Sequence, residues 1–212
     1  AVRDARVAAE DVACVAFSAA MHSLIAVDNE GNALTRSITW ADNRAARWAE
    51  QIRSERDGIA IYRRTGTPIH PMSPLVKLAW LKDEQPQVFN AAARFIGIKE
   101  FVFHRLFDRY VVDHSIASAT GLLNLEKLDW DEEALAVAGI TRERLSTLVP
   151  TTHHIEGLDR QRATDIGLST ATPFVVGAND GALSNVGVDA IRPGDVAVTI
   201  GTSGAMRTVV EV

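Results

Sequence analysis

The amino-acid sequence predicts a mixed α/β fold in which helices alternate with short strands. The first observation is a set of short apolar runs bounded by polar turns, for example at residues 12–17 and 173–177. The second is the recurrence of apolar residues at helical spacing, which is clearest over residues 43–56. The third is a strand, glycine turn and strand pattern at residues 196–210. Alternation of this kind is typical of α/β domains.

The N-terminal part is expected to begin with a strand followed by a hairpin. Residues 12–17 form the strand, which places residues 18–22 at its carboxyl end. Residues 24–27 and 34–38 are expected to pair across a turn at the Asn/Gly cluster of residues 29–32.

Helices are expected through the middle of the chain. The helix over residues 43–56 is predicted to have Asp42 as its N-cap. Ser73 and Pro74, a capping residue followed by a first-turn proline, are predicted to open a second helix. Further helices are expected over residues 85–93, 100–107, 132–138 and 142–148, with a short strand over residues 95–98.

The C-terminal part is expected to hold three strands and one helix. The predicted order is a strand (173–177), a polar loop (179–181), a helix (182–186) and two strands (196–200 and 207–210). The glycine turn of residues 201–204 joins the last two strands. A proline-glycine break at residues 191–194 is the candidate domain boundary.

Charge and composition exclude several functional classes. The 22 Lys+Arg against 27 Asp+Glu give a net charge of −5, so the chain lacks the basic field that nucleic-acid binding requires. Its apolar stretches fall short of the roughly 20 residues of a membrane span. The single cysteine, Cys14, cannot form an internal disulfide and is expected in a buried strand, which fits a reducing cytoplasm. The adjacent histidines at residues 153–154 have no cysteine or histidine at ligand spacing, so no metal site is predicted.

Asp180 is the candidate general base. It follows the apolar run at residues 173–177, and open α/β sheets place their reactive groups at the carboxyl ends of strands. The alternative interpretation is that Asp180 caps the helix that begins near Gly181. The two roles are compatible.

The glycine turn is a candidate phosphate site. Gly201, Thr202, Ser203 and Gly204 offer backbone N–H groups and two hydroxyls in a tight turn, an arrangement that can surround phosphate oxygens. The alternative is a hairpin turn without a ligand. It is not a Walker A loop, because no Gly-Lys-Ser/Thr follows.

Two other segments place polar groups beside apolar ring surfaces, which suits a polyol. Met21 and His22 lie at the end of the first strand, and Trp40, Asp42 and Arg44 lie at a strand-to-helix junction. The alternatives are a structural histidine, core packing of Trp40 and a solvated Arg44.

Five segments, taken together and in order, carry a resemblance to a known family. They are residues 17–23 (FSAAMHS), 39–44 (TWADNR), 113–118 (DHSIAS), 177–181 (GANDG) and 201–204 (GTSG). With them the chain resembles the sugar kinases of the FGGY family over nearly its whole length. Residues 66–74 (GTPIHPMSP) look like the gluconate kinase branch rather than the xylulose or glycerol branches.

The resemblance implies a ribonuclease H-like domain of the actin-like ATPase superfamily, with a mixed sheet flanked by helices. Sugar and ATP would lie in the cleft between two such domains. The implied chemistry is phosphoryl transfer from ATP, with Mg²⁺, to a hydroxyl of a sugar or sugar acid, with gluconate to 6-phosphogluconate as the first expectation. Such a transfer depends on orientation and late deprotonation more than on a strong nucleophile.

The resemblance also implies roles for individual residues. Asp180 would accept the hydroxyl proton. Arg44 is the first choice for a gluconate carboxylate, because a guanidinium matches carboxylate geometry. The residues expected to contact or line the sugar pocket are Met21, His22, Trp40, Asp42, Arg44, His70, Met72, Ser73 and Asn179. Those expected to contact the nucleotide phosphates are Gly201, Thr202, Ser203 and Gly204.

The family pattern is expected to be incomplete in this chain. Residues 1–191 would form the sugar-binding domain without its first phosphate-loop strands, and residues 192–212 the start of the nucleotide-binding domain. No Asp-x-Gly-Thr/Ser turn precedes Val12. The chain alone is therefore expected to be inactive, and the full-length protein to be a cytoplasmic kinase, with a homodimer as one option for its assembly.

Two alternatives remain open at this point. The first is the same chemistry on a ketopentose such as xylulose, which Arg44→Gln would separate from gluconate because only the anionic substrate should suffer. The second is a sugar-binding relative that does no chemistry, against which Asp180 and the glycine turn argue.

Overall fold

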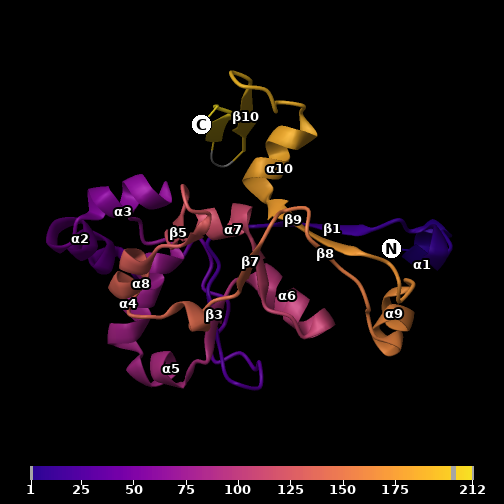
Figure 1. The fold of residues 1–212 in the computed structure, drawn as a ribbon, viewed down its shortest axis with the longest axis horizontal. Coiled ribbons are helices and arrows are strands. Elements are labelled where there is room, and N and C mark those ends of the chain that lie inside the picture. The colour runs from indigo at the N-terminus through magenta and orange to yellow at the C-terminus, as the bar shows by residue number, and fades with distance from the viewer. Residues whose placement is uncertain (1, 202–203, 212) are drawn as a thin grey trace.

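A central sheet joins segments that lie far apart in the sequence. The computed structural model describes residues 2–201 and 204–211, as drawn in Figure 1. In it β1 (Val15–Ala19) pairs in parallel with β9 (Phe174–Asn179), and β8 (His154–Ile155) pairs antiparallel with the other edge of β9. The sheet order is therefore β1-β9-β8, and this mixed arrangement confirms the predicted α/β class.

The strands predicted at residues 12–17 and 173–177 are both confirmed, and each extends further toward its carboxyl end. The prediction that Cys14 lies in a buried strand is wrong, because Cys14 is exposed and precedes β1. Successive side chains of a strand point to opposite faces of the sheet, and along β1 every second side chain is exposed. Cys14 continues this alternation on the exposed side.

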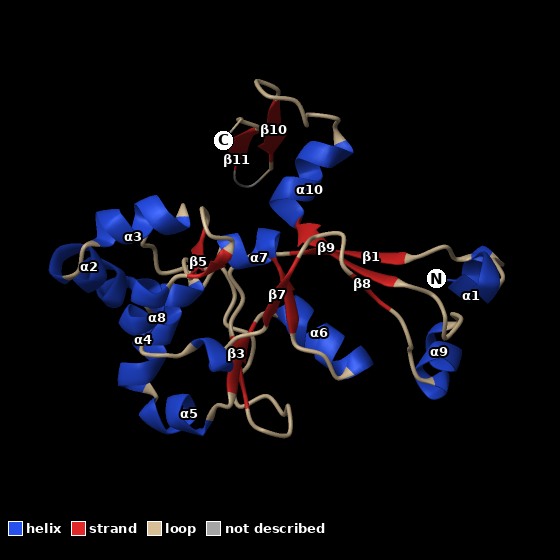
Figure 2. Ribbon diagram, viewed as in Figure 1, coloured by secondary structure: helices blue, strands red, loops and turns tan. Residues whose placement is uncertain are grey.

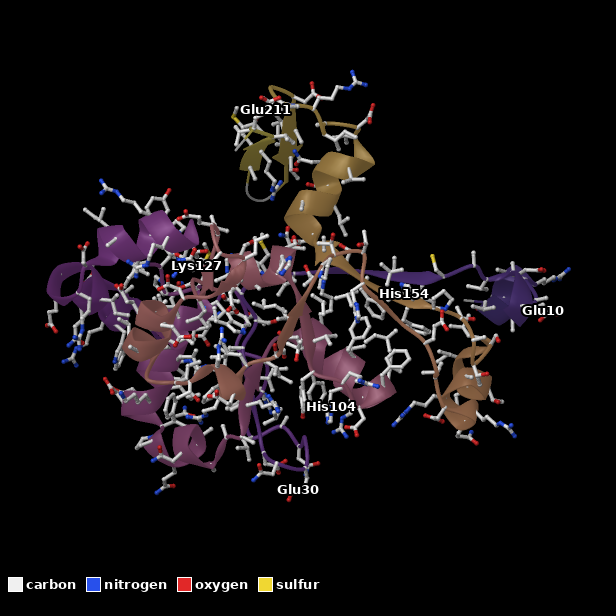
Figure 3. The ribbon with its side chains drawn as sticks, viewed as in Figure 1. Glu10, Glu30, His104, Lys127, His154 and Glu211 are labelled. Carbon is white, nitrogen blue, oxygen red and sulfur yellow. The ribbon has the colours of Figure 1, made fainter. Side chains whose placement is uncertain are left out.

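The predicted N-terminal hairpin exists only as two isolated bridges, Leu24 with Ile38 and Val27 with Ala33. The chain does reverse at the expected turn, where Gly31 has a φ of 79°. The ladder partner of β2 (Ile25–Val27) is instead β3 (Arg94–Ile96), in antiparallel register. Figure 3 labels Glu30 of this turn and His104 at the same end of the molecule, and a side chain at Gly31 would collide with the His104 ring.

A layer of helices packs beside these strands and encloses the larger apolar core (Figure 2). Its members are α2 (Ala46–Glu55), α3 (Gly58–Thr65), α4 (Pro74–Glu84), α5 (Pro86–Ala91) and α8 (Glu132–Ala138). The helix α4 is buried along most of its length and contributes Leu75, Leu78 and Leu81 to this core. A smaller apolar cluster lies under the central sheet and includes Phe103 and Phe174.

One predicted helix cap is wrong, and a second has the predicted position without a capping hydrogen bond from its side chain. The N-cap of α2 is Ala45 without a side-chain hydrogen bond, because the Asp42 carboxylate accepts instead from the backbone N–H and the guanidinium of Arg44. Ser73 does stand at the N-cap of α4, with Pro74 in the first turn, but its hydroxyl donates to the His70 carbonyl rather than capping the helix.

The helix predicted over residues 142–148 is only the 3₁₀ turn η2 (Arg142–Arg144). The chain then enters β7 (Thr147–Val149), which pairs in parallel with β4 (Val111–Asp113). Pairing with a distant strand therefore overrides the local helical pattern.

At the C-terminal side, β9 runs directly into α10 (Asp180–Gly187), so the polar loop predicted at residues 179–181 is absent from the described chain. The antiparallel hairpin of β10 (Val196–Ile200) and β11 (Gly204–Thr208) confirms the predicted final strands, with β11 beginning earlier than expected. Together α10 and the hairpin project away from the helical layer (Figure 1).

The remaining elements complete the described chain. They are α1 (Val2–Ala5), η1 (Ala9–Asp11), α6 (Ile98–Phe107), α7 (His114–Ser118), β5 (Leu123–Asn124), β6 (Asp129–Trp130) and α9 (Arg160–Ile166). Within the described residues, no helix has the length and apolar character needed to cross a membrane.

Candidate active site

The carboxyl ends of β1 and β9 meet at one edge of the central sheet. Ala19 of β1 is the register partner of Asn179 of β9. Met21 and His22 follow the first strand, and Asp180 follows the second, so the fold brings together predicted site residues from opposite ends of the sequence. Strand ends of this kind form the usual ligand crevice of α/β folds.

A β-bulge at Gly177 shapes this edge. Ala16 pairs with Val175 and Ser18 with Ala178, so β9 contains one more residue than β1 between these pairs. Gly177 has a φ of 69°, and a Cβ at this position would lie 2.0 Å from the Phe17 carbonyl oxygen. Only glycine fits here without strain, and the extra residue redirects the chain toward Asp180.

The Asp180 carboxylate is exposed in the first turn of α10. Its Oδ1 accepts a hydrogen bond of 2.8 Å from the backbone N–H of Gly181. The described residues provide no other hydrogen-bond or ion-pair partner for this carboxylate, which leaves Oδ2 open to a ligand. The interpretation of Asp180 as a helix cap is wrong, because Asn179 occupies the N-cap position.

The side chain of Asn179 is fully occupied by protein contacts. Its Oδ1 accepts from the Ala182 N–H at 2.7 Å, and its Nδ2 donates to the hydroxyl and the carbonyl of Ser115 at 2.7 and 3.1 Å. Ser115 follows Asp113, which is fully buried, caps α7 and forms an ion pair with the buried Lys99. This network fixes the start of α10 and hence the position of Asp180.

His22 follows β1 at the sheet edge where Asp180 follows β9. Burial is the main reason why the pKa of His22 is below its usual value, and the hydrogen bond to the Ala119 carbonyl and the Asp180 carboxylate oppose this shift. Its Nδ1 lies 2.8 Å from the Ala119 carbonyl, which can only accept, so Nδ1 carries the proton. The neutral ring therefore offers Nε2 as an acceptor for a ligand hydroxyl.

Lys77 holds the backbone next to His22 and is not among the site residues predicted from the sequence. Its side chain is fully buried in α4, and its ammonium donates to the carbonyls of His22, Ile38 and Thr39 at 2.5, 3.3 and 2.8 Å. Burial lowers the pKa of Lys77 to about 8, against a smaller opposing effect of Asp42. The available signal in the sequence was a single lysine among the apolar residues of a predicted helix, at residues 74–81.

We expect Lys77→Met to loosen the His22 turn, which has a left-handed φ of 66°. Loss of the ammonium leaves buried carbonyls without a donor, which should cost about 2 kcal/mol in the free energy of unfolding. Sugar binding should weaken about tenfold, because a displaced His22 loses one ligand hydrogen bond. Urea titration and calorimetry measure the two effects. Lys82→Met, at an exposed lysine on the same helix, is the matched control, and equal losses in both variants would contradict the role of Lys77.

Trp40, Asp42 and Arg44 follow Thr39, whose carbonyl accepts from Lys77. Trp40 is 61% exposed, so the alternative of core packing is wrong. Arg44 forms a forked ion pair with Asp42, with contacts of 2.7 to 3.1 Å, and its guanidinium stacks 4.4 Å above the Trp80 ring. The pair lowers the pKa of Asp42 and raises that of Arg44. Arg44 lines a separate hollow of about 270 Å³.

The segment before α4 forms a tight turn beside His22. The backbone N–H groups of Met72 and Ser73 donate to the Nδ1 and the carbonyl of His70. Ser73 is buried, whereas His70 is exposed and faces the His22 side. The turn therefore leaves the His70 side chain exposed, whereas the Ser73 hydroxyl is hydrogen-bonded to the His70 carbonyl.

A pocket of about 530 Å³ opens between the strand ends, α10 and β11. Met21, Asn179, Gly181 and Arg207 are among its lining residues. Of the predicted phosphate turn, Gly201 and Gly204 are exposed at the ends of β10 and β11, and Thr202 and Ser203 lie outside the described residues. The described part of the chain contains no group of three or more side chains suited to holding a metal ion.

The chain matches the model of a known protein family over most of its length. The model of the FGGY family of carbohydrate kinases, N-terminal domain, matches residues 1–187. The chain belongs to the FGGY family. This confirms the resemblance found in the sequence motifs.

Individual FGGY kinases are similar to the chain over most of its length. It is 54% identical over 200 residues to a gluconokinase of Bacillus subtilis (strain 168), which covers 94% of the chain and 39% of the relative. The chain thus spans about two fifths of that FGGY protein.

Solved FGGY structures confirm the fold. A crystal structure of gluconate kinase from Lactobacillus acidophilus matches with a TM-score of 0.90 and 41% identity, over 92% of this chain and 40% of the other. A ligand-bound xylulose kinase from the same organism matches with the same values. The actin-like ATPase fold expected for FGGY kinases is therefore present in this domain.

Proposed function

We propose that the whole protein transfers a phosphoryl group from ATP to a hydroxyl of gluconate, giving 6-phosphogluconate, and that this chain supplies the sugar site. The observation that carries the proposal is the open Asp180 carboxylate at the junction of β9 and α10, in a chain 54% identical to a gluconokinase. The meeting of Asp180 with His22 at one sheet edge supports it further.

In this proposal Asp180 acts as the general base. Its Oδ2 accepts the proton of the attacking hydroxyl as the bond to phosphorus forms, while Gly181 N–H holds Oδ1 in place. Asn179 acts indirectly, since its side chain is committed to Ser115 and Ala182 and so orients the base.

The sugar would lie against the strand ends. His22 Nε2 accepts from one hydroxyl, and Met21 offers an apolar surface to the carbon chain. His70 and Met72 form the rim, and Ser73 holds that rim in shape. Trp40 and the Asp42–Arg44 pair would form a further part of the pocket wall, next to the Thr39 carbonyl that Lys77 contacts.

ATP would be bound across the hairpin turn of residues 201–204, where backbone N–H groups can meet phosphate oxygens. Mg²⁺, when bound, would neutralise charge on the phosphates. Mg²⁺ commonly binds through substrate phosphates and one or two carboxylates. We assign residues 1–191 to the sugar-binding domain and residues 192–212 to the start of the nucleotide-binding domain. The need for ATP supports a cytoplasmic location.

The test is ADP release by the purified whole protein with gluconate or xylulose as the acceptor. We expect turnover with gluconate at a kcat/KM at least about a hundredfold above that with xylulose, because a charged group gives strong discrimination. A preference for xylulose would favour the ketopentose kinase, for which the equally good match to a xylulose kinase is the supporting observation. Binding of gluconate without ADP release would favour a non-catalytic relative.

A further inference from the structure

The guanidinium of Arg207 lies against Gly181, the residue that follows the candidate base, and has no acidic partner among the described residues. Arg207 is half-buried on β11, and its Nη1 donates to the Thr199 hydroxyl at 3.3 Å. In residues 2–201 and 204–211 no carboxylate forms an ion pair with it. A charged guanidinium has five N–H donors, so most of its hydrogen-bonding capacity is available to a ligand.

Arg207 approaches the start of α10 closely. A Cβ built on Gly181 would lie 2.9 Å from Arg207 Nε and 3.4 Å from its Cζ, so the guanidinium rests against the residue that follows Asp180. The absence of a side chain at Gly181 makes room for this approach. The hairpin thus places a cation beside the first turn of α10, from outside the central sheet.

The same pocket holds Arg207 and the strand-end residues. Met21, Asn179, Gly181 and Arg207 all line the pocket of about 530 Å³. A ligand that contacts Met21 in this pocket would therefore have Arg207 within the same pocket, and Asp180 lies in sequence between two other lining residues, Asn179 and Gly181. Arg44, by contrast, lines a different hollow.

Arg44 is also already neutralised. Asp42 occupies it with a forked ion pair and Trp80 covers one face of its guanidinium. Asp42 already balances the charge of Arg44, whereas no carboxylate among the described residues balances the charge of Arg207.

We propose that Arg207 binds the carboxylate of a sugar-acid substrate and thereby sets the preference for an acid over a neutral sugar. The inference rests on the proposed function. A planar guanidinium forms two parallel hydrogen bonds with a carboxylate, which gives both affinity and orientation. The carbon chain would then run from Arg207 past Met21 and place its far hydroxyl at Asp180.

The experiment compares gluconate with glucitol, which has CH₂OH in place of the carboxylate, as ligands of the whole protein measured by calorimetry without ATP. In Arg207→Gln we expect gluconate to bind about 10- to 100-fold more weakly, because a hydrogen-bonded charge pair is lost. The affinity for glucitol should change less than about twofold, since no carboxylate is involved. Arg207→Lys should recover part of the gluconate affinity, and Arg63→Gln, at an exposed arginine on α3, is the matched control.

Three results would overturn the inference. The first is an unchanged ratio of gluconate to glucitol affinity in Arg207→Gln. The second is loss of that ratio in Arg44→Gln instead, which would assign the carboxylate to Arg44. The third is normal binding of both ligands with a fall in kcat alone, which would assign Arg207 to the transferred phosphoryl group. Failure of the unaltered protein to phosphorylate gluconate would instead refute the proposed function, so the two failures are distinguishable.

Discussion

The Asp180→Asn variant of the whole protein is expected to lose about three orders of magnitude in kcat with gluconate. The amide has nearly the same size and can still accept the Gly181 N–H through its oxygen, as the carboxylate does at 2.8 Å. It cannot take up the hydroxyl proton, so only the proton-transfer step should suffer. Steady-state ADP release measures the change.

Gluconate binding separates this effect from damage to the fold. Calorimetry of the Asp180→Asn variant should give an affinity close to that of the unaltered protein, because the carboxylate is exposed and supports no other described contact. A variant that retained more than about a tenth of the kcat would contradict the role of Asp180 as base, because base catalysis contributes at least 100-fold.

Replacing Gly177 is expected to have the largest effect on stability. In Gly177→Ala the new Cβ would have to occupy a place 2.0 Å from the Phe17 carbonyl oxygen, on a backbone with a φ of 69°. The strained φ and the clash with backbone should together cost about 3 kcal/mol or more in the free energy of unfolding. The midpoint of urea unfolding measures this loss.

Gly187→Ala is the matched control for that substitution. Gly187 lies in α10, and a Cβ there would meet no atom within 4 Å. Alanine should be neutral or stabilise the helix by about 0.5 to 1 kcal/mol. If Gly177→Ala unfolded at the same urea concentration as Gly187→Ala, the bulge would not need glycine and its proposed part in directing Asp180 would be wrong.

Local sequence signals predicted those elements whose patterns are self-contained. The helix expected at residues 132–138 has these bounds in the structure, because Asp131 caps it and Gly139 ends it in a left-handed conformation. The final hairpin was predicted for the same reason, since its strands and turn are adjacent in sequence. The position of Asp180 at the end of an apolar strand was also evident from local pattern.

The missed features depend on contacts of the folded chain, most of them with partners that are distant in the sequence. β7 was predicted as helix because its pairing with β4 leaves no local trace. Asp42 matched the pattern of a helix cap, but the neighbouring Arg44 competes for its carboxylate. The residues around Lys77 do not indicate that its ammonium contacts the carbonyls of His22 and Thr39.

The sequence alone also could not show whether Arg44 or Arg207 is the better candidate to bind a substrate carboxylate. In the sequence, Arg44 stood among polar residues at a strand-to-helix junction and Arg207 stood in a plain strand. Charge and residue type could not tell which guanidinium was already paired. The ion pair with Asp42 and the approach to Gly181 are properties of the folded chain.

The contacts of Lys77 also bear on the order in which the domain is assembled. Its three carbonyl partners, in His22, Ile38 and Thr39, lie 55, 39 and 38 residues away along the chain. Contacts between such distant residues require large loops to close, and loop closure slows folding. Since one ammonium joins two chain segments, at residue 22 and at residues 38–39, we infer that this part of the candidate site takes its final form only once α4 has docked.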